Sequence, residues 1–166
     1  MPSVSLWWKR MAGKPTPPKV FATNKQARRL YEILETVEAG IVLRGTEVKS
    51  VRAGRANMGD CYARVENGEL WLHDLHISPW SHGNIQNHDP VRPRKLLLHK
   101  REIARLIGKV QRQGLTLIAT RLYAKGPHIK AEVAVGRGKK VHDRREDLKE
   151  REAARDMERA LRERNR

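Results

Sequence analysis

The stretch EAGIVLRGTEVKSVRAG, residues 38–54, decides how the rest of the chain is interpreted. Its apolar run at 41–43 predicts a short strand, which Gly45 ends. A helix near 46–53 follows, in which Thr46 can supply the N-cap, and a glycine stands just past it, where a left-handed residue would end the helix. A strand, a glycine corner and one or two helical turns are typical of the edge of a small, curled sheet.

A β-hairpin is the clearest element, within CYARVENGELWLHDLHI at 61–77. Its two arms flank Asn67-Gly68, a dipeptide that readily adopts the positive φ of a two-residue hairpin turn. Polar and apolar residues alternate along the first arm. On the second arm three leucines are expected to face inward: Leu70, Leu72 and Leu75.

The segment 99–113 predicts a helix with two distinct faces, which Gly114 would end. Its apolar residues recur at i, i+3, i+4 and i+7 and form one buried stripe: Ile103, Leu106, Ile107 and Val110. Basic residues recur on the roughly opposite face: Arg101, Arg105, Lys109 and Arg112. This basic stripe is either an ordinary solvated helix face or part of an RNA-binding surface.

Three more strands complete the expected architecture. LYEILETVEAG can be read as helix or strand, and we favour a strand running into Glu38; 115–124 and 128–135 are strands joined by a short turn. About five or six short strands with flanking helices favour a mainly β fold, an oligonucleotide-binding (OB-type) closed antiparallel β-barrel. A half-open sandwich is the alternative, and the order of elements does not separate the two.

Three parts are expected along the chain. Residues 1–22 read as a flexible, basic, proline-rich arm, whose Trp7 and Trp8 either stack on bases or dock on their own domain. Residues 23–136 would form the barrel, with helices near 46–53 and 99–113. Residues 137–166 form a charged tail with too little apolar surface to pack on the barrel, so it is expected to be disordered or helical and to fold on a partner.

The net charge of +16 points to a polyanionic partner, nucleic acid before anionic membrane. Residues 1–136 carry 23 Lys and Arg against 11 Asp and Glu, and the tail carries 12 against 8. The body is therefore expected to be the main electrostatic footprint. Cys61 is the single cysteine, and no apolar run approaches the length of a membrane span. The N-terminal stretch also lacks a signal-peptide pattern, so we expect a cytoplasmic protein.

An enzyme hypothesis would rest on a group of histidines and aspartates: His73, Asp74, His76, His82, His88 and Asp89. In a strand, His73 and His76 point to opposite faces, whereas metal ligands must converge on one point. His82 and His88 fall in the proline-rich segment 78–95, which is expected to be a long loop ending in basic residues. We therefore expect no catalysis, metal or cofactor. A metal-dependent nuclease and a structural ribosomal or nucleoid protein remain the alternatives to RNA recognition.

Several motifs together resemble the small protein B family, the SsrA-binding proteins of bacterial trans-translation. They follow one another in this order: NKQAR at 24–28, EAG and GTEVKSVRAG within 38–54, DPVRPRKLLLHKREI at 89–103, LIGKV at 106–110, and GRGKKVHDRREDLKER at 136–151. The resemblance covers roughly residues 22–152. It implies an OB-type barrel that binds the tRNA-like domain of transfer-messenger RNA and carries that RNA to stalled ribosomes.

The resemblance also implies which residues bind RNA. The family's RNA-binding positions match Asn24, Glu38, Leu97 and Lys130, and neighbouring basic residues would contact phosphates: Lys25, Arg28, Arg94 and Lys95. Glu38 would orient a base edge or a neighbouring arginine. Arg29 departs from the family pattern, which often has a histidine there.

By the same resemblance, the tail occupies the decoding centre of the small ribosomal subunit and the empty mRNA channel. The matching residues are Gly138, Lys139, Lys140, His142, Asp143, Arg144, Arg145 and Leu148. Elongation factor Tu and alanyl-tRNA synthetase would be indirect partners through the RNA. The protein is expected to act as a monomer and to have no membrane partner.

Overall fold

The computed structural model describes residues 17–83 and 87–164 of the 166-residue chain. Its helices and strands follow in this order: β1 (Val20–Thr23), α2 (Lys25–Leu30), β2 (Tyr31–Ile41), α3 (Gly45–Arg52), β3 (Ala56–Asn57), β4 (Tyr62–Glu66), β5 (Glu69–His73), β6 (His76–Ile77), β7 (Arg94–Leu97), α4 (Lys100–Gln113), β8 (Thr116–Lys125), β9 (His128–Gly138) and α5 (Val141–Arg164). Trp7, Trp8 and most of the predicted N-terminal arm lie outside the described residues.

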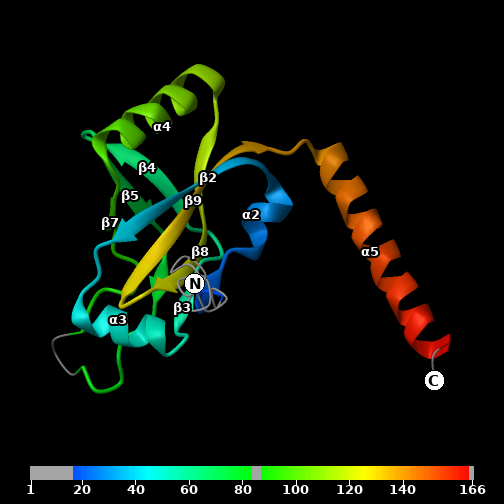
Figure 1. Cartoon of the computed structure of the whole chain (residues 1–166), viewed down its shortest axis with the longest axis horizontal. Helices are drawn as coiled ribbons and strands as arrows, with labels where there is room; N and C mark the ends of the chain where they lie inside the picture. The colour runs from blue at the N-terminus through cyan, green and yellow to red at the C-terminus, as the bar shows by residue number, and fades with distance from the viewer. Residues whose placement is uncertain (1–16, 84–86, 165–166) are drawn as a thin grey trace, which may run out of the picture.

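The strands form a closed ring in which every pairing is antiparallel. Around the ring the order is β8-β4-β5-β7-β2-β9, and β9 pairs back with β8. β1 adds to β8, while β3 and β6 form a separate pair. The predicted mainly β class with flanking helices is confirmed, and Figure 1 shows α4 at one end of the ring and α3 at the other.

Alternation along the strands fills the ring with small and medium apolar side chains. Ala39 of β2, Leu72 of β5 and Val133 of β9 are fully buried. Leu70, Leu72 and Leu75 all face inward, which confirms the prediction for the hairpin. α4 adds Leu106 to this core and α3 adds Val51, so each helix covers the ring with its apolar side.

The predicted turns follow from residues that tolerate positive φ. Asn67 and Gly68, at φ values of 50° and 76°, join β4 to β5 in the two-residue hairpin that the sequence indicates. Gly114, at a φ of 60°, is the C-cap of α4.

The structure differs from the sequence prediction in one helix and at the ends of two other elements. Residues 25–30 form the helix α2, which was not predicted. Asn24 caps this helix, because its side-chain oxygen accepts a hydrogen bond from the Ala27 backbone N–H. Arg44, not Thr46, is the N-cap of α3. β1 begins at Val20, so the last residues of the expected arm belong to the sheet.

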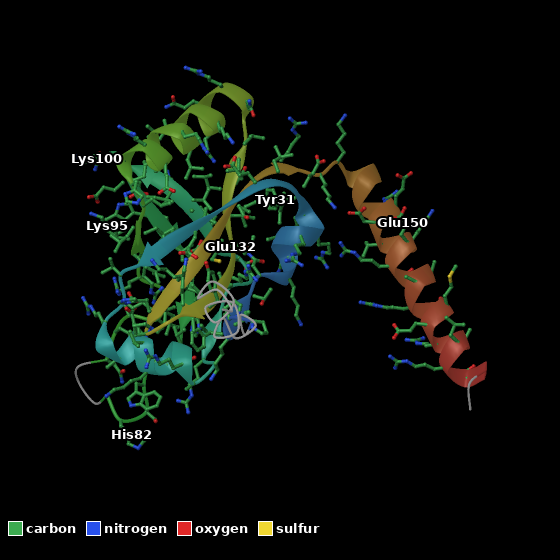
Figure 2. All side chains as sticks on the ribbon, viewed as in Figure 1. Tyr31, His82, Lys95, Lys100, Glu132 and Glu150 are labelled. Carbon is green, nitrogen blue, oxygen red and sulfur yellow. The ribbon has the colours of Figure 1, made fainter. Side chains whose placement is uncertain are left out.

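α5 is a 24-residue helix that stands apart from the ring (Figure 1). Its described side chains are nearly all exposed, and Figure 2 shows those around Glu150 spread on all sides of the helix. Lys139, just before α5, is ion-paired with Asp147, and Arg162 pairs with Glu158 one turn earlier. The second pair supports an exposed helix, whereas the first fixes the start of α5 to the end of β9, where the Lys139 backbone N–H donates to the Leu30 carbonyl. None of the described helices is long and apolar enough to cross a membrane.

Candidate nucleic-acid interface

Strand register brings two of the predicted RNA-binding residues into one row on the outer face of the ring. Gly40 of β2 lies between Leu97 of β7 and Lys130 of β9, and Lys130 in turn lies opposite Tyr123 of β8. Their chain neighbours are buried inside the ring: Leu96, Ala39, Ala131 and Leu122. Because side chains alternate along a strand, the row lies on the outer face, where Leu97 is exposed, Lys130 is half-buried and Tyr123 is 7% exposed.

Because Gly40 has no side chain, the neighbouring Leu97 can pack beside its backbone. A Cβ at Gly40 would lie 3.1 Å from the Cβ of Leu97, closer than most real contacts of that kind. Leu97 is 52% exposed, so an apolar side chain stands on the outer surface beside a gap in the row. A leucine in such a place can pack against a base or a sugar.

Glu38 holds two neighbouring side chains at one end of this row. Its carboxylate accepts a 2.7 Å hydrogen bond from Lys125 Nζ and a 2.5 Å bond from the Tyr123 hydroxyl. These bonds, Lys125 first, lower the pKa of Glu38, and the charge of Lys130 adds to the effect. Burial and the bond to Glu38 raise the pKa of Tyr123 to about 12. Glu38 therefore stays ionised and orients a tyrosine and a lysine, where the sequence predicted a base edge or an arginine.

A second carboxylate, Glu132, lies directly opposite Glu38 in the β2–β9 ladder. Arg121 compensates it, with Nη2 2.7 Å from Glu132 Oε2, and the Arg121 guanidinium also lies 5.2 Å from the centre of the Tyr123 ring. Like charges opposite each other destabilise a sheet unless each has a partner. The outcome is a surface network of Lys125, Glu38, Tyr123, Arg121 and Glu132, which we call the sheet-face network.

The sequence did not single out Tyr123, Lys125 or Arg121. A signal was present, because the short turn after Lys125 pairs β8 with β9 and alternation then sends Arg121 and Tyr123 outward. The pairing of β9 with β2, which brings Glu38 to this network, carries no local signal.

α2 carries a second group of predicted residues. Lys25 and Arg28 are exposed on this helix, which lies between the ring and α5 in Figure 1. Asn24 is instead 3% exposed, and its amide Nδ2 donates a 3.1 Å bond to the Ala119 carbonyl. We therefore correct the interpretation of Asn24: its side chain positions α2 and is not presented to a ligand.

Arg94 also differs from its predicted role. The side chain is fully buried and ion-paired with Glu47 of α3 at 2.9 Å, and its other N–H groups donate to the carbonyls of Leu75, Arg92 and Pro90. Arg92 pairs with the same carboxylate. The expected basic cluster at 92–95 is therefore largely an internal support for the loop before β7, with Lys95 the only one of its three cations on the outer face, paired there with Glu69.

Burial opposes the ionisation of Glu47. Hydrogen bonds from Arg92 and the Arg44 backbone, together with the charges of the two arginines, outweigh burial and leave the pKa of Glu47 lowered. Glu47 lies in the GTEVKSVRAG motif, but neither its burial nor its partners could be inferred from spacing.

The predicted tail residues lie where β9 gives way to α5. Gly138 ends β9, Lys139 is tied to Asp147, and Lys140 is exposed. Arg145 is exposed and Leu148 is 42% exposed. The remaining three residues lie in the first turn of α5, and their side chains are outside the described part: His142, Asp143 and Arg144.

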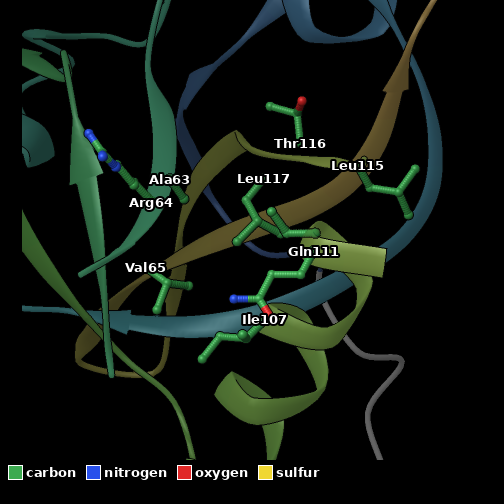
Figure 3. A pocket seen from close by; sticks show the side chains of 9 residues that line it. Ala63, Arg64, Val65, Ile107, Gln111, Leu115, Thr116 and Leu117 are labelled. Carbon is green, nitrogen blue, oxygen red and sulfur yellow. The ribbon is translucent and has the colours of Figure 1, made fainter. Parts of the chain in front are cut away.

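The histidines and the main apolar hollow offer no alternative centre in the described residues. His88 is buried between Thr46 and the Ile77 carbonyl, and His73 stacks on Tyr62. Among described residues no group of three potential metal ligands converges. A hollow of about 440 Å³ lies between α4, β4 and the start of β8, with Val65, Ile107 and Leu117 in its lining (Figure 3).

Comparisons with known proteins agree on one family. The SmpB protein family model matches residues 21–163. An SsrA-binding protein of Carboxydothermus hydrogenoformans is 56% identical over 144 residues, covering 87% of this chain and 97% of that protein. An SsrA-binding protein of Nostoc punctiforme is 57% identical over 152 residues, covering 91% and 98%. A solved structure described as "tmRNA-SmpB: a journey to the center of the bacterial ribosome" aligns with a TM-score of 0.61 at 49% identity, over 76% of this chain and 87% of that one.

Proposed function

The chain belongs to the SmpB protein family, and on that premise we propose that it binds the tRNA-like domain of transfer-messenger RNA and delivers it to stalled ribosomes in trans-translation. The relatives are named SsrA-binding proteins, and the description of the similar solved structure names tmRNA-SmpB and the bacterial ribosome. We propose a non-enzymatic cytoplasmic factor that acts as a monomer and uses no cofactor or metal. Elongation factor Tu and alanyl-tRNA synthetase would meet it only through the RNA.

The observation that carries the proposal is the row of Leu97, Gly40, Lys130 and Tyr123 on the outer sheet face. The exposed Leu97 offers packing and Lys130 offers a phosphate contact, while the largely buried Tyr123 is held by Glu38 and supports the surface beside them. Folded RNA is recognised mostly by shape and backbone, with a few bases packed on side chains. Lys25, Arg28 and Lys95 would add phosphate contacts around this row, while Asn24 and Arg94 would act from the interior by positioning.

We further infer that the ring of strands is an OB-type barrel and that it constitutes the domain from about residue 23 to about 136. The closed antiparallel ring and a helix inserted before its last two strands support this assignment.

The tail would place Gly138, Lys139, Lys140, His142, Asp143, Arg144, Arg145 and Leu148 in the decoding centre, with α5 in the empty mRNA channel. Support comes from the position of α5, which projects from the ring (Figure 1), and from its described side chains, nearly all of which are exposed. Its mixture of acids and bases suits a helix surrounded by RNA and solvent better than one packed on an apolar core.

A reconstituted reaction tests the whole proposal. Ribosomes stalled at the end of a truncated message would be supplied with charged transfer-messenger RNA, with and without this protein. We expect tag addition to the nascent peptide only when the protein is present. Equal tag addition in both reactions would overturn the proposal.

A further inference from the structure

Lys139 fixes the tail to the body just before α5 begins. It follows Gly138, the last residue of β9, which pairs with Tyr31 at the start of β2. The backbone N–H of Lys139 also donates a 2.9 Å bond to the carbonyl of Leu30, the last residue of α2. The chain is therefore held by the ring and by α2 up to two residues before Val141, where α5 starts.

The side chain of Lys139 reaches forward into the tail helix. Its Nζ donates to a carboxylate oxygen of Asp147, in the second turn of α5. Both of these side chains are partly buried, whereas those of Arg162 and Glu158, which pair farther along α5, are mostly exposed. Because partly buried pairs are screened less by salt, the Lys139–Asp147 pair is the stronger link of the two.

Local electrostatics keeps this pair ionised. The bond from Lys139 lowers the pKa of Asp147, and the positive charge of Arg151, one turn later in α5, lowers it further. An ordinary lysine is protonated at neutral pH. The ammonium and the carboxylate are therefore both charged under the conditions in which the protein would meet RNA.

The pair spans a connection that would otherwise act as a hinge. Only Lys139 and Lys140 separate the end of β9 from the start of α5. Rotations of one part of a protein against another concentrate in such short segments, where a few residues absorb the change in backbone angles. A bond from the first residue of this connection to the second turn of the helix limits the directions that α5 can take.

We propose that the Lys139–Asp147 pair sets the direction in which α5 leaves the ring, so that Asp147 is a positioning residue for the tail. The inference rests on the proposed function, in which α2 lies against transfer-messenger RNA and α5 enters the mRNA channel. Because Lys139 is bonded to both helices, the pair holds the tail at a set orientation to the bound RNA before the ribosome is met. An orientation that is already set reduces the ordering cost of entering the channel.

This role divides the work of the two lysines in the connection. The ammonium of Lys139 is engaged by Asp147. Lys140 is exposed and makes no ion pair with any other residue that the structure describes. Of the two, Lys140 is therefore the cation open to a phosphate, and Lys139 supports the helix that follows.

The test compares full-length Asp147→Asn with Glu150→Gln, which removes the same charge from an exposed position on α5. Spin labels at Arg64→Cys on β4 and Met157→Cys on α5 report the distance between ring and tail, since the natural Cys61 is buried. We expect one narrow distance distribution in the natural sequence and in Glu150→Gln, and a clearly broader one in Asp147→Asn. Asp147→Glu, which keeps the carboxylate, should restore the narrow distribution. Helix content should be unchanged, because asparagine and aspartate have nearly the same helix propensity.

Tag addition on stalled ribosomes at limiting protein concentration gives the functional readout. Asp147→Asn should slow it roughly threefold, the size expected for one partly exposed ion pair, with unchanged affinity for the tRNA-like domain. An unchanged distance distribution in Asp147→Asn, equal effects of Glu150→Gln, or a broader distribution with tag addition at the natural rate would overturn the inference. If the natural protein supported no tag addition, the proposed function would fail instead, and the distances would still decide whether the pair directs α5.

Discussion

Two glutamates with lowered pKa values organise the molecule at the residue scale, one outside the ring and one inside it. Glu38 holds Lys125 and Tyr123 on the outer face, where Lys125 is exposed and Tyr123 is 7% exposed. Glu47 is fully buried and neutralises Arg92 and Arg94, which brace the loop before β7. We propose a role in RNA binding for Glu38, and the buried ion pairs of Glu47 give it a role in stability.

Lys130→Glu tests the outer row. Lys130 faces outward and lies opposite Gly40 and Tyr123, so the change should leave the ring folded and weaken binding of the tRNA-like domain by about 1–3 kcal/mol. Filter binding measures the effect, and Lys49→Glu on α3 is the matched control with the same charge change. An unchanged dissociation constant for Lys130→Glu would remove this lysine from the interface.

Glu47→Gln tests the buried cluster. Removing the carboxylate leaves Arg94 buried without its counter-charge, which should lower the free energy of unfolding by about 3–5 kcal/mol. Urea denaturation measures the loss. Glu69→Gln, which breaks the partly exposed pair with Lys95, should cost about 1 kcal/mol or less. Comparable effects of the two changes would contradict the structural role of Glu47.

The same residue sets a pH dependence. Because the pKa of Glu47 is lowered on folding, its ionisation contributes stability that is present above its ordinary pKa of 4.5 and is lost as the pH falls through the folded-state value. The free energy of unfolding should therefore fall less steeply with acidification in Glu47→Gln than in the natural chain. Parallel curves for the two proteins between about pH 5 and pH 3 would argue against this contribution.

At the element scale, local patterns predicted most of the secondary structure. Asn67-Gly68 indicated the hairpin, and the apolar stripe through Leu106 indicated α4, because each signal lies within a few residues. α2 was missed because a six-residue helix is too short to show a helical repeat of apolar residues. Its cap, Asn24, is also held by contacts with β8 and Cys61, which lie far away in the chain. The tail was predicted as disordered or helical, and the structure has it as the helix α5.

Truncation after Lys140 tests the separation of α5 from the ring. It removes an exposed helix and breaks the ion pair between Lys139 and Asp147, so the free energy of unfolding should change by about 1 kcal/mol or less, and binding of the tRNA-like domain should persist. Tag addition on stalled ribosomes should be lost. Full tag addition by the truncated protein would contradict the role proposed for the tail, whatever its RNA affinity.

At the scale of the whole molecule, topology is what the sequence could not supply. The hairpin at 61–77 and the turn between 115–124 and 128–135 were predicted, but the pairing of β9 with β2, which closes the ring, joins residues 90 to 107 positions apart in the chain. The pairings of β9 with β2 and β8 together create the candidate site, since they place Lys130 beside Gly40 and Tyr123 beside Glu38. Arg94 was predicted on the RNA-binding surface for the same reason. Its hydrogen bond to Glu47 forms only when the chain folds, and sequence spacing does not indicate it.

The most general alternative to specific RNA recognition is that the protein, with its net charge of +16, binds any polyanion. The proposed function, in contrast, requires recognition of one particular folded RNA. The most direct test is a competition at about 150 mM salt, in which the labelled tRNA-like domain of transfer-messenger RNA is challenged with excess elongator tRNA and with duplex DNA. The account predicts that neither competitor displaces the label at concentrations where the unlabelled domain does. Equal displacement by all three would contradict it, and the surface described here would then be charge alone.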